Sequence, residues 1–459
     1  MNLASALHAR PRPWMPATSS LLGHLPDYSR DPLAFTDGLL RSGHDVVFCR
    51  FGWVRSYFVF DADIAHHVLV GNAANYGKNT RGIRKLKLLL GRGLLTNQGD
   101  AWRRQRRIAQ PAFRRKAINA LGEIMVNAAQ QSAARFAARG AHVDDITREL
   151  NALTLRIAAE TLFSVDIGDD GARVAESLTT ALAHFPRLVT APLPYPELLP
   201  TPGNLRFHLA VRSIDQIVCR IIEQRRRELE RGGEHKADLL GLLMEARDPE
   251  SGEAMSDRQL RDEVVTMMLA GHETTANALA FTLMMLGKHP DVAAEVEHEI
   301  DTVIGGRAPT AADVMQLRRT RSVLFESMRL YPPAWTTVRT AEGADRLGEY
   351  PISKGAYVYI SPYALHRSPR YWRDPDVFRP ERFDDEEQAK ARPKLAFMPF
   401  GAGQRKCIGD HFAQLEATLV LAVLLRRLRF SALRGQLVEL EPSVTLRPRG
   451  GLTMSVAPR

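Results

Sequence analysis

Cys407, one of three cysteines, lies in the glycine-rich segment FGAGQRKCIG, residues 400–409. Thiolates are soft, strong metal ligands, and a single one can hold haem iron. Backbone N–H groups directed at the sulfur would stabilise it, and glycines let the backbone come that close. Arg405 can pair with a cofactor carboxylate through its planar fork, and Phe400 can shield the sulfur from water. The segment suits an axial thiolate on a metal with charged side arms; its glycines are Gly401, Gly403 and Gly409.

Two other interpretations of this segment exist. A lone cysteine beside a glycine is usually a buried structural residue in a turn, but six fixed residue types rarely coincide. Gly401 and Gly403 also begin like a dinucleotide fingerprint, yet Lys406 stands where the third glycine is required. No strand-then-helix unit surrounds the segment either, so a metal-binding thiolate is favoured.

A second chemical pattern, AGHETTA, covers residues 270–276 in the middle of a long apolar segment. A zinc-binding H-E-x-x-H would need a second histidine at the position of Ala276. Threonine hydroxyls can bond back to the preceding helical turn and bend it, which opens a groove. The acid Glu273 and the alcohol Thr274 could then relay protons. A solvated or kinked helix is the alternative for this pattern taken alone.

Two further patterns indicate no particular function when each is taken alone. Glu326 and Arg329 are spaced i, i+3 and could form a surface pair. Trp102 and Arg106 are one helical turn apart in AWRRQRR and could belong to an ordinary basic helix face.

Taken together, these strings resemble the landmarks of the cytochrome P450 family, in the family's order and over most of the chain. The cysteine segment is similar to the haem-binding loop, and AGHETT is similar to the oxygen-binding motif A-G-x-[DE]-T-T. The resemblance implies that Cys407 ligates the iron of haem b. It also implies that Thr274 hydrogen-bonds bound O₂ and that Glu273 helps deliver protons, while Ala270 and Gly271 leave space over the iron.

The resemblance assigns further roles. Trp102, Arg106 and Arg339 would bind haem propionates, and Glu326, Arg329 and Arg382 would form a structural network that supports the cysteine segment. The residues expected to line the substrate pocket are Ala270, Met267, Ala334, Trp335 and Val338, with Met268 beside them. His366 is expected to be structural, and Cys49 and Cys219 are expected to be inert among apolar neighbours.

The elements that must position these residues are mainly helical, with small β elements near both ends. Ser256 and Gln259 form an S-x-x-Q capping box before a helix of roughly 30 residues that should cross the core. A helix is predicted over 318–330, and another follows Cys407. A hairpin is predicted about Gly52, and a second about Gly450 in the tail. The proline-rich segment 192–203 is a loop or a linker, and the motifs favour a loop.

The family implies one triangular, mostly helical catalytic domain over residues 1–459, whose first 40 residues lie on the surface. We expect no fused reductase. The chain contains no signal-peptide pattern, no apolar run near the ~20 residues of a membrane span, and no disulfide framework. We therefore expect a cytoplasmic protein, and the expected oligomeric state is a monomer.

The net charge of +10 and a pI near 9.7 suggest an acidic partner. The basic clusters RRQRR, FRRK and Lys394–Lys406 would share the thiolate side and attract a separate ferredoxin or flavodoxin, reduced from NAD(P)H by its own reductase. The basic residues are scattered without an aromatic-interleaved recognition motif, which argues against nucleic-acid binding.

We expect a monooxygenase that inserts one atom of O₂ into an apolar molecule. RLYPPAW and AGHETT look closer to family members that act on fatty acids and terpenoids than to those that act on macrolides. The alternatives are a peroxide-using hydroxylase, against which the Glu273–Thr274 pair argues, and a non-catalytic haem carrier or sensor, which would need no proton relay.

Overall fold

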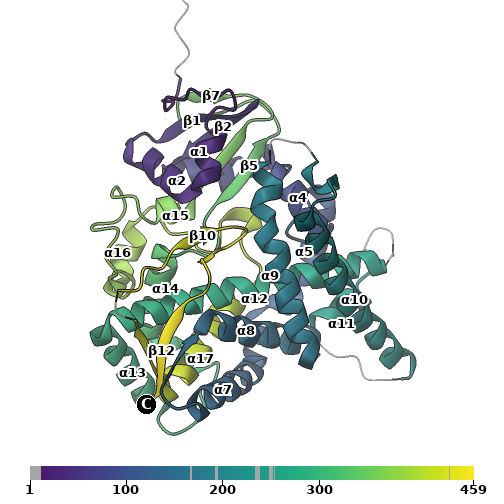
Figure 1. The fold of residues 1–459 in the computed structure, drawn as a ribbon, viewed down its shortest axis with the longest axis vertical. Helices are drawn as coiled ribbons and strands as arrows, with labels where there is room; N and C mark the ends of the chain where they lie inside the picture. Colours follow the sequence, from purple (N-terminus) through teal and green to yellow (C-terminus); the bar gives the residue numbers. More distant parts are fainter. Residues whose placement is uncertain are drawn as a thin grey trace, which may run out of the picture. The chain divides into compact units, whose positions relative to one another are not determined.

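The computed structural model of the chain describes residues 12–165, 168–191, 195–232, 238–247, 252, 254–433 and 435–459. The chain forms two compact units, each assembled from three separate segments (Figure 1). The first unit comprises Met1–Arg81, Trp335–Asp376 and Lys390–Lys406; the second comprises Gly82–Ala334, Val377–Ala389 and Cys407–Arg459.

The first unit is built on a five-stranded sheet with the order β1-β2-β8-β5-β3. The predicted hairpin about Gly52 is confirmed, because β1 and β2 pair antiparallel and Gly52 takes a φ of +59° in the turn. β2 pairs parallel to β8, and β5 pairs antiparallel to both β8 and β3. The strands are β1 (Val46–Phe51), β2 (Val54–Val59), β3 (Tyr76–Gly77), β5 (Thr337–Ala341) and β8 (Tyr357–Ile360), with the small hairpin β6 (Asp345–Leu347) and β7 (Tyr350–Ile352).

Short helices surround this sheet, and its apolar side chains form the core of the unit. They are α1 (Leu25–Arg30), α2 (Pro32–Arg41), α3 (Ala62–His66) and α15 (Pro362–Leu365). Single turns lie at His67–Gly71, Ala73–Asn75, Lys394–Ala396 and Gly403–Arg405.

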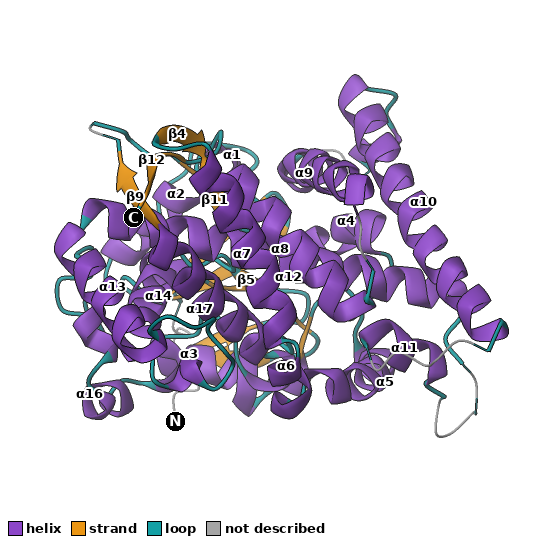
Figure 2. Cartoon of the chain, turned by 90° about the horizontal axis from the view of Figure 1, so that it is seen from below, coloured by secondary structure: helices purple, strands orange, loops and turns teal. Residues whose placement is uncertain are grey.

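The second unit is mainly helical, and Figure 2 shows how far helix dominates over strand. Its helices up to the central one are α4 (Arg81–Leu90), α5 (Gly99–Ala109), α6 (Arg115–Ala120), α7 (Gly122–Ala138), α8 (Ile146–Phe163), α9 (Gly168–Thr190), α10 (Pro202–Glu230), α11 (Leu239–Glu245) and α12 (Asp257–Lys288). The later ones are α13 (Pro290–Ile304), α14 (Arg318–Leu330), α16 (Glu386–Ala391) and α17 (Asp410–Arg427). Single turns lie at Gln110–Phe113, Pro196–Leu198, Asp313–Met315 and Pro380–Phe383.

The long helix predicted after Ser256 is confirmed as α12, which has 32 residues. Its first turn is closed by the predicted capping box between Ser256 and Gln259. The helix is buried on nearly all sides because α8, α14 and α17 pack around it (Figure 1). The helix predicted over 318–330 is α14, and α17 is the helix predicted after Cys407.

The predicted hairpin in the tail is wrong. β11 (Leu446–Pro448) pairs with β10 (Leu440–Pro442), whereas β12 (Thr453–Pro458) lies between β9 (Leu428–Ala432) and β4 (His142–Asp145). Gly450 and Gly451 have positive φ and do make a turn. The turn leads the chain into another sheet, because partners for β12 on both sides satisfy more backbone groups than β11 alone would.

The proline-rich segment 192–203 lies between α9 and α10, both in the second unit, so it is a loop within that unit; residues 192–194 lie outside the described residues. Among the described residues, no helix combines the length and apolar character that a membrane span requires.

Candidate functional site

Cys407 is exposed and lies three residues before the first residue of α17. Gly409 is the N-cap of that helix, and a side chain there would contact the Phe113 ring and the Cys407 sulfur at 3.7 and 4.0 Å. Burial lowers the pKa of Arg106, while the negative charges of Cys407 and Asp410 raise it. A positive charge that interacts with the sulfur in this way would favour its thiolate form.

Arg106 belongs to α5, which also carries the buried Trp102 one turn earlier. The predicted pair therefore lies on one face of one helix, with Trp102 packed inward. The exposed residues around this part of the chain are strongly basic: Arg103, Arg107, Arg114, Arg115 and Lys116.

Three residues in the middle of α12 are accessible, although the residues before and after them are buried. From Asp262 to Leu286 every residue is buried except Ala270, which is exposed, and Gly271 and Thr274, which are half-buried. A surface-accessible alanine in the centre of a core helix leaves space for a bound molecule. This opening and the exposed Cys407, both in the second unit, fit a flat cofactor with a thiolate ligand.

Thr274 and Gly271 contribute to this opening differently. The Thr274 hydroxyl donates to the Ala270 carbonyl at 2.6 Å, which is the predicted bond back to the preceding turn. A side chain on Gly271 would instead face α8, at 3.5 Å from the Ala158 methyl group. The open space is therefore formed at Ala270 and Thr274.

Glu273 is buried and directed toward β11. Its Oε1 atom lies 3.4 Å from Nη1 of Arg447. Burial raises the pKa of Glu273, while Arg447 and Thr445 lower it. The neighbouring His272 is also buried, and desolvation lowers its pKa to about 4, so its ring is uncharged at neutral pH. Arg447 is a residue that sequence reasoning missed, because no spacing rule connects it to AGHETT.

The Glu326–Arg329 pair on α14 is fully buried, so it is not a surface pair. Arg329 Nε and Nη2 donate to the two oxygens of Glu326 at 2.7 and 2.8 Å. Arg382 reaches the same carboxylate, with 3.4 Å between Nε and Oε1, and the backbone N–H of Arg379 donates to it at 2.8 Å. The structure thus brings all three predicted network residues together.

The first unit gathers three cations. Arg339 is buried on β5, and burial lowers its pKa to about 10. The pKa of Lys78 is lowered well below its usual value, first by burial and then by the charges of Arg339 and Arg405. Such a cluster would bind anionic carboxylates strongly. Sequence reasoning missed Lys78, whose position follows from the pairing of β3 with β5, in which Gly77 lies opposite Thr340.

The remaining predicted positions vary in exposure. Phe400 and Gly401 are half-buried in the first unit, and Gly401 has a φ of +69°. Met267, Met268 and Trp335 are buried, Val338 is half-buried and Ala334 is exposed.

His366 and Cys49 are buried, whereas Cys219 is exposed. His366 is buried and accepts a hydrogen bond from the Met398 N–H at 2.9 Å, which is a structural contact. Cys49 is buried, and desolvation raises the pKa of its thiol to about 12. Cys219 is exposed on α10, so its predicted apolar surroundings are wrong; its side chain falls on the outer face of the helix.

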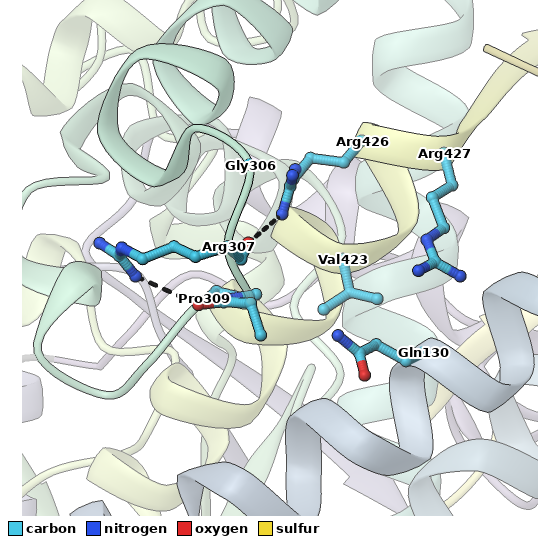
Figure 3. Close-up of a pocket in the computed structure, with 8 residues that line it drawn as sticks. Gln130, Gly306, Arg307, Pro309, Val423, Arg426 and Arg427 are labelled. Carbon is cyan, nitrogen blue, oxygen red and sulfur yellow. Dashed lines mark hydrogen bonds between the residues drawn. The ribbon is translucent and has the colours of Figure 1, made fainter.

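A small surface pocket lies at the far end of α17 from Cys407 (Figure 3). It has a volume of about 130 Å³ between Gln130, residues 306–309 and the last turn of α17. Arg426 lines this pocket and donates to the Gly305 carbonyl at 2.5 Å. Because a helix rises 1.5 Å per residue, roughly 25 Å separates this pocket from Cys407, so it is no part of the site.

Comparison with known proteins agrees with this geometry. The sequence profile of the family described as "Cytochrome P450" matches residues 13–454. The chain belongs to the cytochrome P450 family and is a haem-thiolate monooxygenase that uses O₂. The mainly helical fold and the family predicted from sequence are thereby confirmed.

Three relatives align along most of their length. Cyclooctat-9-en-7-ol 5-monooxygenase of Streptomyces melanosporofaciens is 38% identical, over 92% of this chain and 91% of the relative. Cyclooctatin synthase of the same organism is 36% identical, over 97% and 95%. Pentalenene oxygenase of Streptomyces avermitilis is 34% identical, over 94% and 92%.

Proposed function

We propose that this monooxygenase hydroxylates a terpenoid, with Cys407 as the axial ligand of its haem and the opening at Ala270 as the place of reaction. The substrate class is supported by relatives whose names specify cyclooctat-9-en-7-ol and pentalenene. The observation that carries the assignment of the site is that Ala270 is exposed in the middle of the buried stretch of α12, residues 262–286.

Cys407 would hold the haem through its thiolate, and the bound haem would supply the chemistry of O₂ activation. Arg106 would stabilise the thiolate of Cys407 and, with Trp102, bind a propionate. In the first unit, Lys78, Arg339 and Arg405 would bind propionate carboxylates through charge-assisted hydrogen bonds.

Thr274 and Glu273 would control protons. The Thr274 hydroxyl, now donating to the Ala270 carbonyl, can turn toward the opening and donate there instead. Glu273 would hold a proton in the buried space and pass it on, since burial favours its neutral form. Apolar side chains such as Met267 would keep water away from the reacting carbon.

Electrons would come from a separate acidic electron-transfer protein, a ferredoxin or flavodoxin with its reductase. The exposed arginines and Lys116 that follow Trp102 lie on elements near Cys407, and their charge would steer such a partner.

The test is a spectral titration of the purified ferric protein with cyclic terpenes, fatty acids and a macrolide. We expect cyclic terpenes to displace the iron-bound water, seen as a shift of the Soret band, with the tightest apparent affinity. Saturation by the macrolide or a fatty acid alone would overturn the substrate class. A reduced, CO-treated protein without the red-shifted Soret band of thiolate ligation would overturn the site.

A further inference from the structure

The hairpin of β10 and β11 brings a second carboxylate to Arg447. Glu441 lies directly opposite Arg447 in the register of the two strands, where opposite charges attract across the strand pair. The distance between Nε of Arg447 and Oε2 of Glu441 is 3.1 Å. A different nitrogen of the same guanidinium, Nη1, lies 3.4 Å from Oε1 of Glu273 on α12. Arg447 is therefore shared between two carboxylates and is closer to the one on its own hairpin.

These three side chains lead from the interior of the second unit to its surface. The side chain of Glu273 is 7% exposed, that of Arg447 is 14% exposed and that of Glu441 is 30% exposed. One positive charge cannot balance two carboxylates, and here the shorter contact goes to the carboxylate that water reaches more easily. The buried carboxylate of Glu273 thus receives only part of the stabilisation that an arginine of its own would give.

The strand that carries Arg447 is fixed to the helices, so the sharing follows from the fold. The backbone N–H of Leu446 donates to the Pro333 carbonyl at 2.9 Å. From α12, Asn277 Nδ2 donates to the Thr445 hydroxyl at 3.3 Å. Asn277 follows Glu273 by four residues, so both side chains lie on the face of α12 that the hairpin covers.

The two partners of this arrangement act on Glu273 with opposite signs. Among the described residues, Oε2 of Glu273 is buried and has no hydrogen-bond partner, which favours the neutral carboxyl group. Burial raises the pKa of Glu273, Arg447 and Thr445 lower it, and the negative charge of Glu441 raises it. Glu441 consequently opposes the effect of the arginine that it holds.

We propose that Glu441 is a positioning residue for the reaction: by sharing Arg447 with Glu273, it keeps the Glu273 carboxyl group out of a permanent ion pair and so lets that group carry a proton. This inference rests on the proposed function, in which Glu273 controls protons, and adds to it the residue that sets how easily Glu273 is protonated.

Other charged groups on the elements packed against α12 are paired with one another or uncharged. Glu416 of α17 is fully buried, and desolvation raises its pKa well above the ordinary value, so its carboxyl group is neutral. His272, next to Glu273, is neutral as well. The paired groups are Arg156 with Glu160 on α8, Arg225 of α10 with Asp238, Glu326 with Arg329 on α14, and Arg429 of β9 with Glu297 of α13.

Removing the charge of Glu441 and removing Arg447 should therefore change Glu273 in opposite directions. Glu441→Gln takes away a negative charge and leaves Glu273 as the carboxylate partner of Arg447, so the pKa of Glu273 should fall. Arg447→Ala takes away the positive charge, so that pKa should rise. An ion pair that only stabilised the hairpin would produce neither change.

The experiment observes the protonation of Glu273 directly, by infrared spectroscopy of the ferric holoprotein over a series of pH values. The C=O stretching band of a protonated carboxyl group that disappears in Glu273→Gln belongs to Glu273. The pH midpoint of this band is compared among wild type, Glu441→Gln and Arg447→Ala. O₂-dependent turnover of the cyclic terpene that gives the tightest Soret titration is measured at the same pH values.

The matched control is Glu439→Gln, which removes the same charge from the same hairpin. Glu439 pairs with Arg449 at 3.5 Å, and both side chains are largely in solvent. The effect of this substitution on Glu273 should be small because exposed charges are screened by water and salt. A general change of surface charge is thereby separated from the sharing of Arg447.

Glu441→Gln should move the midpoint of the Glu273 band to lower pH and Arg447→Ala should move it to higher pH, while Glu439→Gln keeps the wild-type midpoint. Above the midpoint, turnover by Glu441→Gln should fall about tenfold for each pH unit by which the midpoint moves, because the protonated fraction falls in that proportion. The Soret shift and the CO spectrum should stay as in wild type. If Arg447→Ala fails to fold, Glu441→Gln carries the test, since its side chain already reaches solvent.

The inference is overturned if Glu441→Gln keeps the wild-type midpoint, or if Glu439→Gln moves the midpoint as far as Glu441→Gln does. It is also overturned if Glu441→Gln moves the midpoint and leaves the pH profile of turnover unchanged. When Glu273→Gln loses turnover in any of these cases, the proton role of Glu273 in the proposed function stands. If Glu273→Gln turns over like wild type, that proton role fails, and the inference fails with it.

Discussion

Two acid–arginine pairs of the second unit, each with a buried carboxylate, differ in how many hydrogen bonds the carboxylate accepts. Arg329 holds both oxygens of Glu326 at 2.7 and 2.8 Å, and Arg382 and a backbone N–H complete the set. Oε1 of Glu273 lies 3.4 Å from Nη1 of Arg447, and a hydrogen bond with the Thr445 side chain also lowers the pKa of Glu273. The Glu326 carboxylate is held in one position by these donors. The Glu273 carboxylate can change its hydrogen-bond partner and its protonation state. The comparison separates a group that supports the fold from one that can move a proton.

The largest effect should come from breaking the locked pair. Arg329→Ala leaves the carboxylate of Glu326 buried without its main partner, which should cost about 3–5 kcal/mol of the free energy of unfolding. We expect little haem-loaded protein, measured by the yield of the thiolate CO spectrum and by thermal unfolding. If Arg329→Ala kept a normal yield of haem-loaded protein and a normal unfolding temperature, the Glu326–Arg329 pair would not be needed to support the fold.

Substitutions at Glu273 and at the neighbouring Thr274 should affect turnover and leave the fold intact. Glu273→Gln and Thr274→Ala should each lower O₂-dependent product formation by about 10²-fold, the usual contribution of a positioned proton donor. Unfolding temperature and the CO spectrum should stay near wild type. Peroxide-supported turnover should be less affected, and an equal loss in both assays would argue against a proton role.

Arg447→Ala tests whether Glu273 changes its protonation state during the reaction. The charge of Arg447 lowers the pKa of Glu273, so its removal should raise that pKa and move the corresponding limb of the pH–rate profile to higher pH. Because a raised carboxyl pKa destabilises the folded state as pH rises, the variant should also lose stability relative to wild type above neutral pH. An unshifted profile would show that Glu273 does not titrate in the reaction.

The smallest effect is expected for an exposed pair. Glu223 and Arg227 are spaced i, i+4 on α10, and both are largely in solvent. Glu223→Gln should change neither the unfolding temperature nor turnover measurably, because exposed pairs contribute little. A clear loss of stability or turnover in this variant would contradict the expectation that exposed ion pairs contribute little.

Sequence reasoning succeeded where the determining interactions are local. The start of α12 depends on Ser256 and Gln259, three residues apart, and the turn at Gly52 depends on its own φ. The motifs around Cys407 and Ala270 are contiguous strings, so their resemblance to a family is visible without a structure.

The failures other than Cys219 involve partners distant in sequence. β12 joins β4 across about 300 residues, and no rule of spacing selects it over β11. Lys78 approaches Arg339 only because β3 pairs with β5. The attachment of Leu94 to Glu263 likewise depends on packing between segments about 170 residues apart, as does the contact of Arg447 with Glu273.

The position of β12 has a consequence for biosynthesis. β12 is the middle strand of its sheet, so β4 can gain its partner only after about 300 further residues have been translated. At roughly 5–20 residues per second this takes about 15–60 s. During that interval the backbone edge of the nascent β4 is open to other chains, and chaperone supply or slower growth should therefore govern how much haem-loaded protein a host yields.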